Sequence, residues 1–468
     1  MSFTCKDIEI LIAQENPFQE DKLDREKLAP VLTAIANAYA HSGAVLAIDG
    51  EWGSGKTTFV KMWQQDLTNN GYNTLYFNAW ATDFIEDPLI ALMGELKEVI
   101  GTDANEALIK NIGRIGLKVG GELLKTGIKK ITGIDSDSIQ AGIDGTTDII
   151  QEQINSYKGD KDKLETFKTK LGEYVASAAI DSKHPIVFFI DELDRCNPRY
   201  AVKLLERVKH LFEVPNIIFV LAVNIKQLQY AIQGYYGSSN IDGQEYLKRF
   251  IDLTYTLPAP DLKNYTKVLF EAHAFTDFFN DEIRLRNDLQ HEGDVFLYMA
   301  QDLISYSNIN LRLANKIFAY TRIVLQGFPI TSRVPADLLF LLCFIKITNP
   351  NLYRKIQNGE FTLQELIDSL ELELPNEIFH REPGSFTQHH LCWAVAALIL
   401  RYNYPSTGIP REKDFERKVM EKEFPIQTKR LDKKELYDAL NYHIGNTHYI
   451  YGLKDMLDRI NLTSKLHL

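Results

Sequence analysis

The chain contains one stretch whose residue types and spacing are suited to binding a nucleoside triphosphate. Residues 50–57, GEWGSGKT, match the P-loop pattern G-x-x-x-x-G-K-[ST]. In this pattern the loop amides and the following helix N-terminus face the phosphates, Lys56 reaches the terminal phosphates and Thr57 ligates Mg²⁺. We therefore expect Mg-ATP as the ligand. Its contacts are expected from Glu51, Trp52, Gly53, Ser54, Gly55, Lys56, Thr57 and Thr58.

A second stretch places two carboxylates at the end of an apolar strand. Five apolar residues, IVFFI at 186–190, precede Asp191 and Glu192. Ligands of open parallel sheets collect at the carboxyl ends of the strands. Asp191 is therefore expected to hold Mg²⁺, and Glu192 to orient or deprotonate the attacking water. A solvent-exposed acidic loop would look the same by itself, but the P-loop upstream favours the catalytic interpretation.

Asn224 is a further polar residue at the end of an expected strand, residues 216–223. From there its side chain can contact the nucleophilic water or the γ-phosphate. It can equally cap the helix that begins at residue 225, since asparagine is a preferred N-cap. Both roles remain open. No guanine-reading NKxD motif follows this strand, which favours adenine over guanine.

Apolar strands alternate with helices around these motifs. The alternation predicts an α/β P-loop NTPase fold with a parallel sheet covered on both faces. The expected strands are residues 44–48, 74–80, 186–192, 216–223 and 251–257. The expected helices are residues 25–40, 56–67, 88–100, 200–212 and 225–233.

The order of the segments predicts an interrupted core followed by helical domains. We expect core parts at 1–100 and 183–260, a helical insertion at 101–182, a helical lid at 261–327 and a C-terminal helical domain at 328–468. The glycine-rich stretch 112–134 within the insertion carries too many charges for a membrane span. A helical excursion packed on its own domain is favoured there over an amphipathic helix on a membrane or partner.

Composition limits the classes of function. The net charge of -11 and the pI of about 5.6 leave no global positive field for nucleic acid. The N-terminal residues lack a secretory pattern, and the longest apolar runs are shorter than the ~20 residues that span a bilayer. We therefore expect a cytoplasmic protein without a transmembrane segment. Reduced thiols, and no zinc site, are expected from the widely spaced Cys5, Cys196, Cys343 and Cys392.

Several motifs in order give a family resemblance. The P-loop, FNAW at 77–80, DELDRCNP at 191–198, the AVN strand end and YLKRFIDLTYTLP at 246–258 together resemble the KAP family of P-loop NTPases. FNAW and DELDRC in this order point to the family, and the resemblance covers roughly residues 20–325. It implies an additional-strand ATPase core with a helical lid, related to the AAA+ and STAND classes. It also implies a role in signalling or in conflict with phage.

The resemblance implies two further basic residues. Arg249, beside Lys248, stands where AAA+-like proteins present an arginine to the nucleotide of a neighbouring subunit, which would make the protein a homo-oligomer. Arg312 lies in NLRLAN, which differs from the family pattern N-P-R-x-x-K-R-x-x-N by leucine in place of proline, and would sense phosphate. A surface arginine is the alternative for each. Many relatives carry paired transmembrane helices where this chain has residues 101–182 without a span.

These features predict an ATP-driven switch or remodeller. ATP binding would close the lid, hydrolysis would reopen it, and the C-terminal helical region would pass the change to a protein partner. Antiviral defence is the leading biological setting. One rival is a scaffold that holds nucleotide with little turnover, against which Glu192 counts. The other is a nucleic-acid-stimulated motor, against which the net acidity counts.

Overall fold

The computed structural model describes residues 12–85, 184–209, 214–379, 386–404, 409–445 and 451–462, together with residues 88, 91, 92 and 172. The expected insertion at 101–182 and most of the expected helix at 88–100 lie outside the described residues. The described residues divide into two units, one up to Ala259 and one from Pro260 onward.

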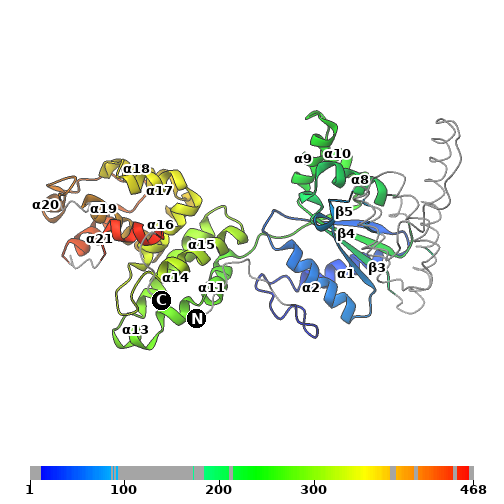
Figure 1. Ribbon diagram of the computed structural model, residues 1–468, viewed down its shortest axis with the longest axis horizontal. Coiled ribbons are helices and arrows are strands. Elements are labelled where there is room, and N and C mark those ends of the chain that lie inside the picture. The colour runs from blue at the N-terminus through cyan, green and yellow to red at the C-terminus, as the bar shows by residue number, and fades with distance from the viewer. Residues whose placement is uncertain are drawn as a thin grey trace, which may run out of the picture. The chain divides into compact units, whose positions relative to one another are not determined.

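The first unit is built on a five-stranded parallel sheet in the order β2-β3-β4-β1-β5 (Figure 1). Its strands are β1 (Ala44–Asp49), β2 (Thr74–Asn78), β3 (Ile186–Asp191), β4 (Ile217–Val223) and β5 (Leu253–Thr256). The register sets Asn78 opposite Asp191, and Asp49 opposite Val223. The carboxyl ends of four neighbouring strands therefore meet at one edge of the sheet, with Asn224 directly after β4.

Helices cover both faces of this sheet, which confirms the predicted fold class. On one face lie α1 (Leu28–Ala38) and α2 (Lys56–Asn69), and on the other lie α8 (Pro198–Val208), α9 (Ile225–Tyr236) and α10 (Gly243–Leu247) (Figure 1). Along β3, Val187 and Phe189 belong to the hydrophobic cluster of the first face, whereas Phe188 and Ile190 belong to that of the second. Burial on both faces explains why the strand is apolar throughout.

Strand ends differ from the sequence-based expectation by a few residues. β2 was expected to reach residue 80 but ends at Asn78, because the chain turns there into a short 3-10 helix, η1 (Trp80–Thr82). β5 begins at Leu253 rather than at residue 251. The Asp252 carboxylate accepts a hydrogen bond from the backbone of Val45 at 2.8 Å. This contact fixes the start of the edge strand against β1.

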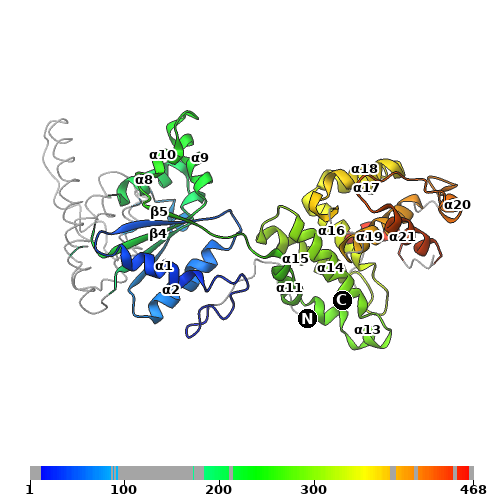
Figure 2. The same cartoon turned by 180° about the vertical axis from the view of Figure 1, so that it is seen from behind.

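All the regular secondary structure described in the second unit is helical (Figure 2). One hydrophobic cluster runs through it from Leu269 to Ile460. The expected boundary between a lid and a C-terminal domain at 327/328 stays a prediction. Within the described residues, no helix is long and apolar enough to cross a membrane. The helices of the second unit are α11 (Leu262–Ala272), α12 (Phe275–Phe279), α13 (Glu282–Arg286), α14 (His291–Tyr306), α15 (Leu311–Leu325), α16 (Ala336–Thr348), α17 (Pro350–Asn358), α18 (Leu363–Glu373), η3 (Asn376–Phe379), α19 (Phe386–Asn403), α20 (Phe415–Met420), α21 (Lys433–Gly445) and α22 (Leu453–Ile460).

Candidate nucleotide-binding site

The loop between β1 and α2 has the tight backbone that a phosphate-binding loop requires. Gly53 and Gly55 have φ values of 75° and 85°, in the left-handed region that favours glycine. At Gly50 a Cβ atom would lie 2.9 Å from the Ser54 Oγ, so a side chain does not fit without movement. The two left-handed glycines, Gly53 and Gly55, are thus needed for the loop's own shape. Gly55 also directly precedes α2, whose first amides face the loop.

Lys56 begins α2 and folds back over the loop. Its side chain is only 8% exposed, and its ammonium donates hydrogen bonds to the carbonyls of Gly50 and Glu51, the latter at 3.1 Å. Burial lowers the pKa of Lys56, while the nearby carboxylates of Asp194 and Asp191 oppose that shift. A desolvated cation at the N-terminus of a helix is a favourable place for an anion.

Asp191 lies at the end of β3 with 1% of its surface exposed. Its carboxylate accepts hydrogen bonds from the Tyr76 hydroxyl at 2.8 Å and from the backbone of Glu192 at 2.8 Å. Burial raises the pKa of Asp191; hydrogen bonds from Tyr76 and from the Thr57 side chain oppose this. Thr57 and Asp191 are therefore in contact and offer a hydroxyl and a carboxylate oxygen side by side. Oxygen ligands of this kind suit Mg²⁺, which binds proteins through one or two carboxylates plus substrate phosphates.

Glu192 directly follows this strand in an unusual backbone conformation. Its φ of 61° is left-handed, which is uncommon for a residue with a side chain and costs on the order of 1–3 kcal/mol. Both carboxylate oxygens have partners. Oε1 lies 2.7 Å from Nη1 of Arg195, and Oε2 accepts a hydrogen bond from Nδ2 of Asn78 at 3.1 Å. The carboxylate is thereby held in one place beside the P-loop and Asp191.

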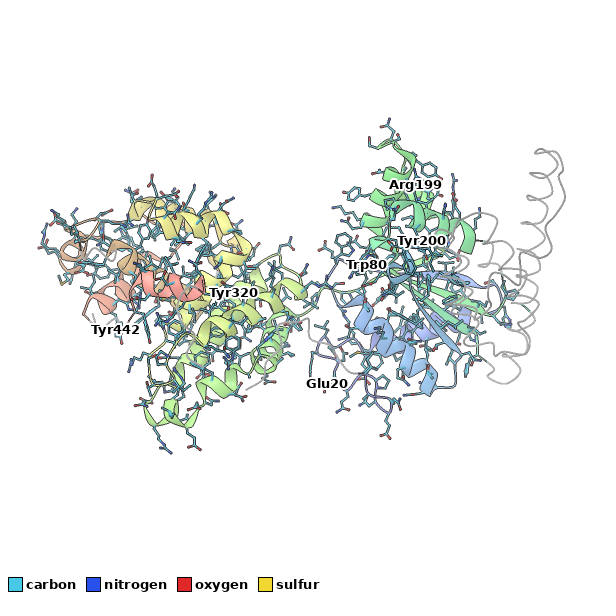
Figure 3. The ribbon with its side chains drawn as sticks, in the orientation of Figure 1. Glu20, Trp80, Arg199, Tyr200, Tyr320 and Tyr442 are labelled. Carbon is cyan, nitrogen blue, oxygen red and sulfur yellow. The ribbon has the colours of Figure 1, made fainter. Side chains whose placement is uncertain are left out.

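The two motifs that suggested the family, FNAW and DELDRCNP, are in direct contact. Asn78 faces β3 and holds Glu192, while the Arg195 guanidinium lies 5.7 Å from the centre of the Trp80 ring. Another hydrogen bond joins the two motifs, from the Ala79 amide to the Asp191 carbonyl. Two more join residues at or just after their ends, one between the Thr82 and Tyr200 hydroxyls and one from the Asn197 amide to the Asp83 carboxylate. Figure 3 labels Trp80, the last residue of the first motif, and Tyr200, two residues after the second.

Trp52, inside the P-loop, is connected to the same acidic segment. Its indole Nε1 donates a hydrogen bond to Oδ2 of Asp194 at 2.5 Å, while 41% of the residue remains exposed. The loop after β1 and the loop after β3 are therefore linked by a direct side-chain contact. A change in the P-loop would alter the surroundings of this tryptophan.

Asn224 takes the capping role that was one of its two alternatives. Its Oδ1 accepts a hydrogen bond from the backbone of Gln227 at 3.1 Å, at the start of α9. Its position after β4, between β1 and β3, puts it at the same edge of the sheet as the P-loop and Asp191. A second role of this side chain toward the attacking water stays a prediction.

The two predicted basic residues lie on different units. Arg249 is exposed between α10 and β5, and its guanidinium lies 5.6 Å from the ring centre of Tyr246. The adjacent Lys248 is engaged by Glu245 at 2.8 Å, whereas Arg249 has no salt bridge to any of the residues that the structure describes. Arg312 is the second residue of α15, in the helical unit. The functions proposed for Arg249 and Arg312 stay predictions.

Three residues near the P-loop were not identified from sequence. Asn78 and Arg195 stand out in the sequence only as members of family motifs, yet both hold Glu192. Arg25 belongs to no motif, yet its Nη2 donates a hydrogen bond to the Ser54 carbonyl at 2.7 Å. The motif membership of Asn78 and Arg195 was a usable signal. For Arg25 the only signal was an arginine at the beginning of an apolar helix.

Comparison with known families agrees with the motifs and the sheet. The model of the KAP family P-loop domain matches residues 25–324, which is more than half of the chain. The chain belongs to the KAP family. The predicted resemblance is therefore confirmed, and residues 50–57 lie within the matched segment. The matched segment begins at Arg25 and ends within α15.

Individual relatives of this KAP-family chain are distant. An uncharacterised protein of Methanocaldococcus jannaschii is 25% identical over 174 residues, which cover 32% of this chain and 88% of that protein. Among solved structures, the Aeropyrum pernix ORC2 protein in its ADPNP–ADP complexes has a TM-score of 0.34 at 13% identity, over 90% of this chain and 95% of that one. Its ADP form has a TM-score of 0.35 at 12% identity, over 94% and 96%.

Proposed function

We propose that this KAP-family chain binds Mg-ATP at the P-loop and hydrolyses it. The observation that carries the proposal is the placement of a P-loop lysine, a buried aspartate and a glutamate at the ends of strands β1 and β3 in one sheet. Only the combination supports hydrolysis. A P-loop alone supports binding, whereas a carboxylate beside it supplies a group that can accept a proton from water.

Each residue has a defined part in the reaction. Lys56 exchanges the loop carbonyls for phosphate oxygens. Asp191 and Thr57 would hold Mg²⁺, which would neutralise charge on the phosphates. A water oxygen bonds to the γ-phosphorus as the bond to the bridging β,γ-oxygen breaks, so that ADP leaves with that electron pair. Glu192 accepts the proton that the water releases.

The decisive experiment replaces Glu192 by glutamine. ATP affinity, measured by calorimetry in Mg²⁺, should stay close to wild type because the P-loop is unchanged. Steady-state phosphate release should fall by ~10²–10⁴-fold, since the amide cannot take the proton. Glu271→Gln, an exposed glutamate of α11, is the control and should change neither quantity. Equal turnover in wild type and Glu192→Gln would refute the assigned role.

One observation favours a second candidate, a scaffold that holds nucleotide with little turnover. Both oxygens of Glu192 are engaged, by Arg195 and by Asn78, which is an arrangement expected of a resting site. A scaffold predicts that wild type binds ATP yet releases almost no phosphate in a steady-state assay. Measurable turnover that depends on Glu192 would reject it.

We further propose that turnover drives a switch in the helical unit and that the unit contacts a protein partner. Support comes from the position of the family domain, which ends at residue 324 and leaves more than a hundred further residues outside it. Hydrogen exchange with and without ATP tests the switch, which predicts altered protection in α11–α15. Identical exchange in both states would reject it.

A setting in defence against phage and a homo-oligomeric state complete the proposal. The first is supported by the family resemblance alone, and the second by the exposed Arg249. Plating efficiency of phage on cells with wild type or Lys56→Ala tests the first. An unchanged plating efficiency between the two would remove the defence role.

A further inference from the structure

Arg25 connects the segment before α1 to the phosphate-binding loop. It lies three residues before the start of α1 and is only 3% exposed. Its Nη2 donates a hydrogen bond of 2.7 Å to the backbone carbonyl of Ser54, 29 residues further along the chain. Ser54 stands between the two left-handed glycines of the loop. The guanidinium therefore contacts the loop where its backbone is most sharply turned.

The second terminal nitrogen of this guanidinium is buried without a hydrogen-bond partner. Nη1 of Arg25 has no hydrogen-bond partner, and neither has the Oγ of Ser54. Buried polar groups in folded proteins are nearly always hydrogen-bonded, and an arginine carries five N–H donors to satisfy. Two unsatisfied groups, on residues that contact each other beside a P-loop, indicate that the site lacks a polar partner.

The charge of Arg25 is also only partly compensated. Burial lowers the pKa of Arg25 to about 10, which still leaves it a cation at neutral pH. Asp21 opposes that shift, but its carboxylate accepts hydrogen bonds from the backbone amides of Leu23, Arg25 and Glu26. Arg25 forms no salt bridge with any described residue. A buried cation without a paired anion is costly, so an anion at this place stabilises the protein.

We propose that Arg25 is a positioning residue of the nucleotide site, whose buried charge is balanced by the phosphates of the bound nucleotide and whose bond to Ser54 fixes the loop. The inference rests on the proposed binding of nucleotide. According to this inference, a residue before the P-loop contributes to nucleotide affinity through its contact with the loop backbone. The alternative is a structural anchor that only ties the N-terminal segment to the core. The apolar contacts of α1, through Leu32 and Ala36, already serve that purpose.

The test compares Arg25→Met with wild type by calorimetry with ADP, ATP and inorganic pyrophosphate in Mg²⁺, and by thermal unfolding without ligand. Methionine keeps an unbranched apolar stem but removes the guanidinium and its charge. Affinity for all three ligands should fall by about tenfold or more, the value of a charged hydrogen bond. The ligand-free melting temperature should stay equal or rise, because an unbalanced buried cation is gone. Arg199→Met, at the exposed start of α8 (Figure 3), should change neither.

The outcomes separate this inference from the proposed function. A wild type that binds neither ATP nor ADP defeats the nucleotide site itself. A wild type that binds, with an Arg25→Met protein of equal affinity and a lower melting temperature, overturns the inference and leaves the site intact. If Arg25→Met does not fold, Arg25→Gln replaces it, since glutamine also removes the charge but keeps a polar N–H donor. Wild-type affinity in a folded Arg25→Gln protein with a lowered melting temperature would also overturn it.

Discussion

Nη1 of Arg195 lies 2.7 Å from Oε1 of Glu192, three residues earlier in the same acidic motif. The guanidinium also lies over Trp80, a residue that is 52% exposed. The carboxylate proposed to take the water's proton is therefore held by a cation whose other neighbour is at the surface. Asn78 holds the second oxygen at 3.1 Å. A movement of Trp80 would therefore alter the position of Arg195 and, through it, that of the Glu192 carboxylate.

Removal of the Arg195 contact should raise turnover. Arg195→Gln frees Oε1 of Glu192, and a partly exposed ion pair of this kind is worth about 1 kcal/mol, so the kcat for phosphate release should rise by about fivefold. The KM for ATP should not change, because neither residue is part of the P-loop. Arg199→Gln is the matched control. A large fall in kcat with Arg195→Gln would show instead that the pair orients Glu192 productively.

Loss of the P-loop ammonium should weaken ATP binding and leave the fold intact. Lys56→Ala removes a charged contact to the phosphates, and ATP affinity in Mg²⁺ should fall by about 10–100-fold. Calorimetry measures the affinity, and circular dichroism the fold. Lys61→Ala, an exposed lysine of the same helix, is the control. The Trp52 fluorescence should respond to ATP in wild type only, with Trp52→Phe identifying its signal among the other tryptophans. Wild-type affinity in Lys56→Ala would show that the nucleotide binds elsewhere.

A shared site between subunits should show itself by complementation. Arg249→Ala and Glu192→Gln should each bind ATP but hydrolyse it slowly. Mixed in equal amounts, they should regain part of the phosphate release, because some interfaces join an intact Glu192 to an intact Arg249. The double change of Lys248 and Arg249 runs beside the single one, since a neighbouring lysine can replace part of the charge. Full activity in a strictly monomeric protein, measured by mass photometry, would end this idea.

Stability of the helical unit should depend on one buried carboxylate. Glu371, on α18, is 2% exposed and accepts hydrogen bonds from the backbone amides of Lys429, Arg430 and Leu431 at 2.9–3.0 Å. Glu371→Gln removes the charge and leaves amides without a good acceptor, so the free energy of unfolding should fall by about 1–3 kcal/mol. Urea unfolding measures it. The exposed Glu377→Gln is the control, and equal losses in both would mean that the carboxylate is not the cause.

The elements were predictable where local pattern and burial act together. β3 is apolar throughout because both its faces are covered, and it was placed to within one residue. The P-loop is a contiguous pattern and was recognised without the fold. The contacts that shape the site were not predictable, because they join distant positions. Asn78 and Glu192 are 114 residues apart, and they meet only because β2 lies beside β3 in the sheet. Strand order cannot be inferred from the periodicity of single strands.

The left-handed backbone of Glu192 means that the side chain proposed for hydrolysis is not the one that best stabilises this position. Asparagine adopts this conformation more readily than glutamate does, and so Glu192→Asn should lower the local strain while the side chain becomes too short and neutral for its proposed task. If glutamate is kept here for the proposed hydrolysis, selection acts against substitutions such as Glu192→Asn that would stabilise the protein. In lineages that came to use the nucleotide only as a structural ligand, this glutamate should be among the first of the site's residues to be replaced, well before Lys56 or the glycines of the loop. The residue that each relative has at position 192 would thus indicate whether that relative still hydrolyses the nucleotide.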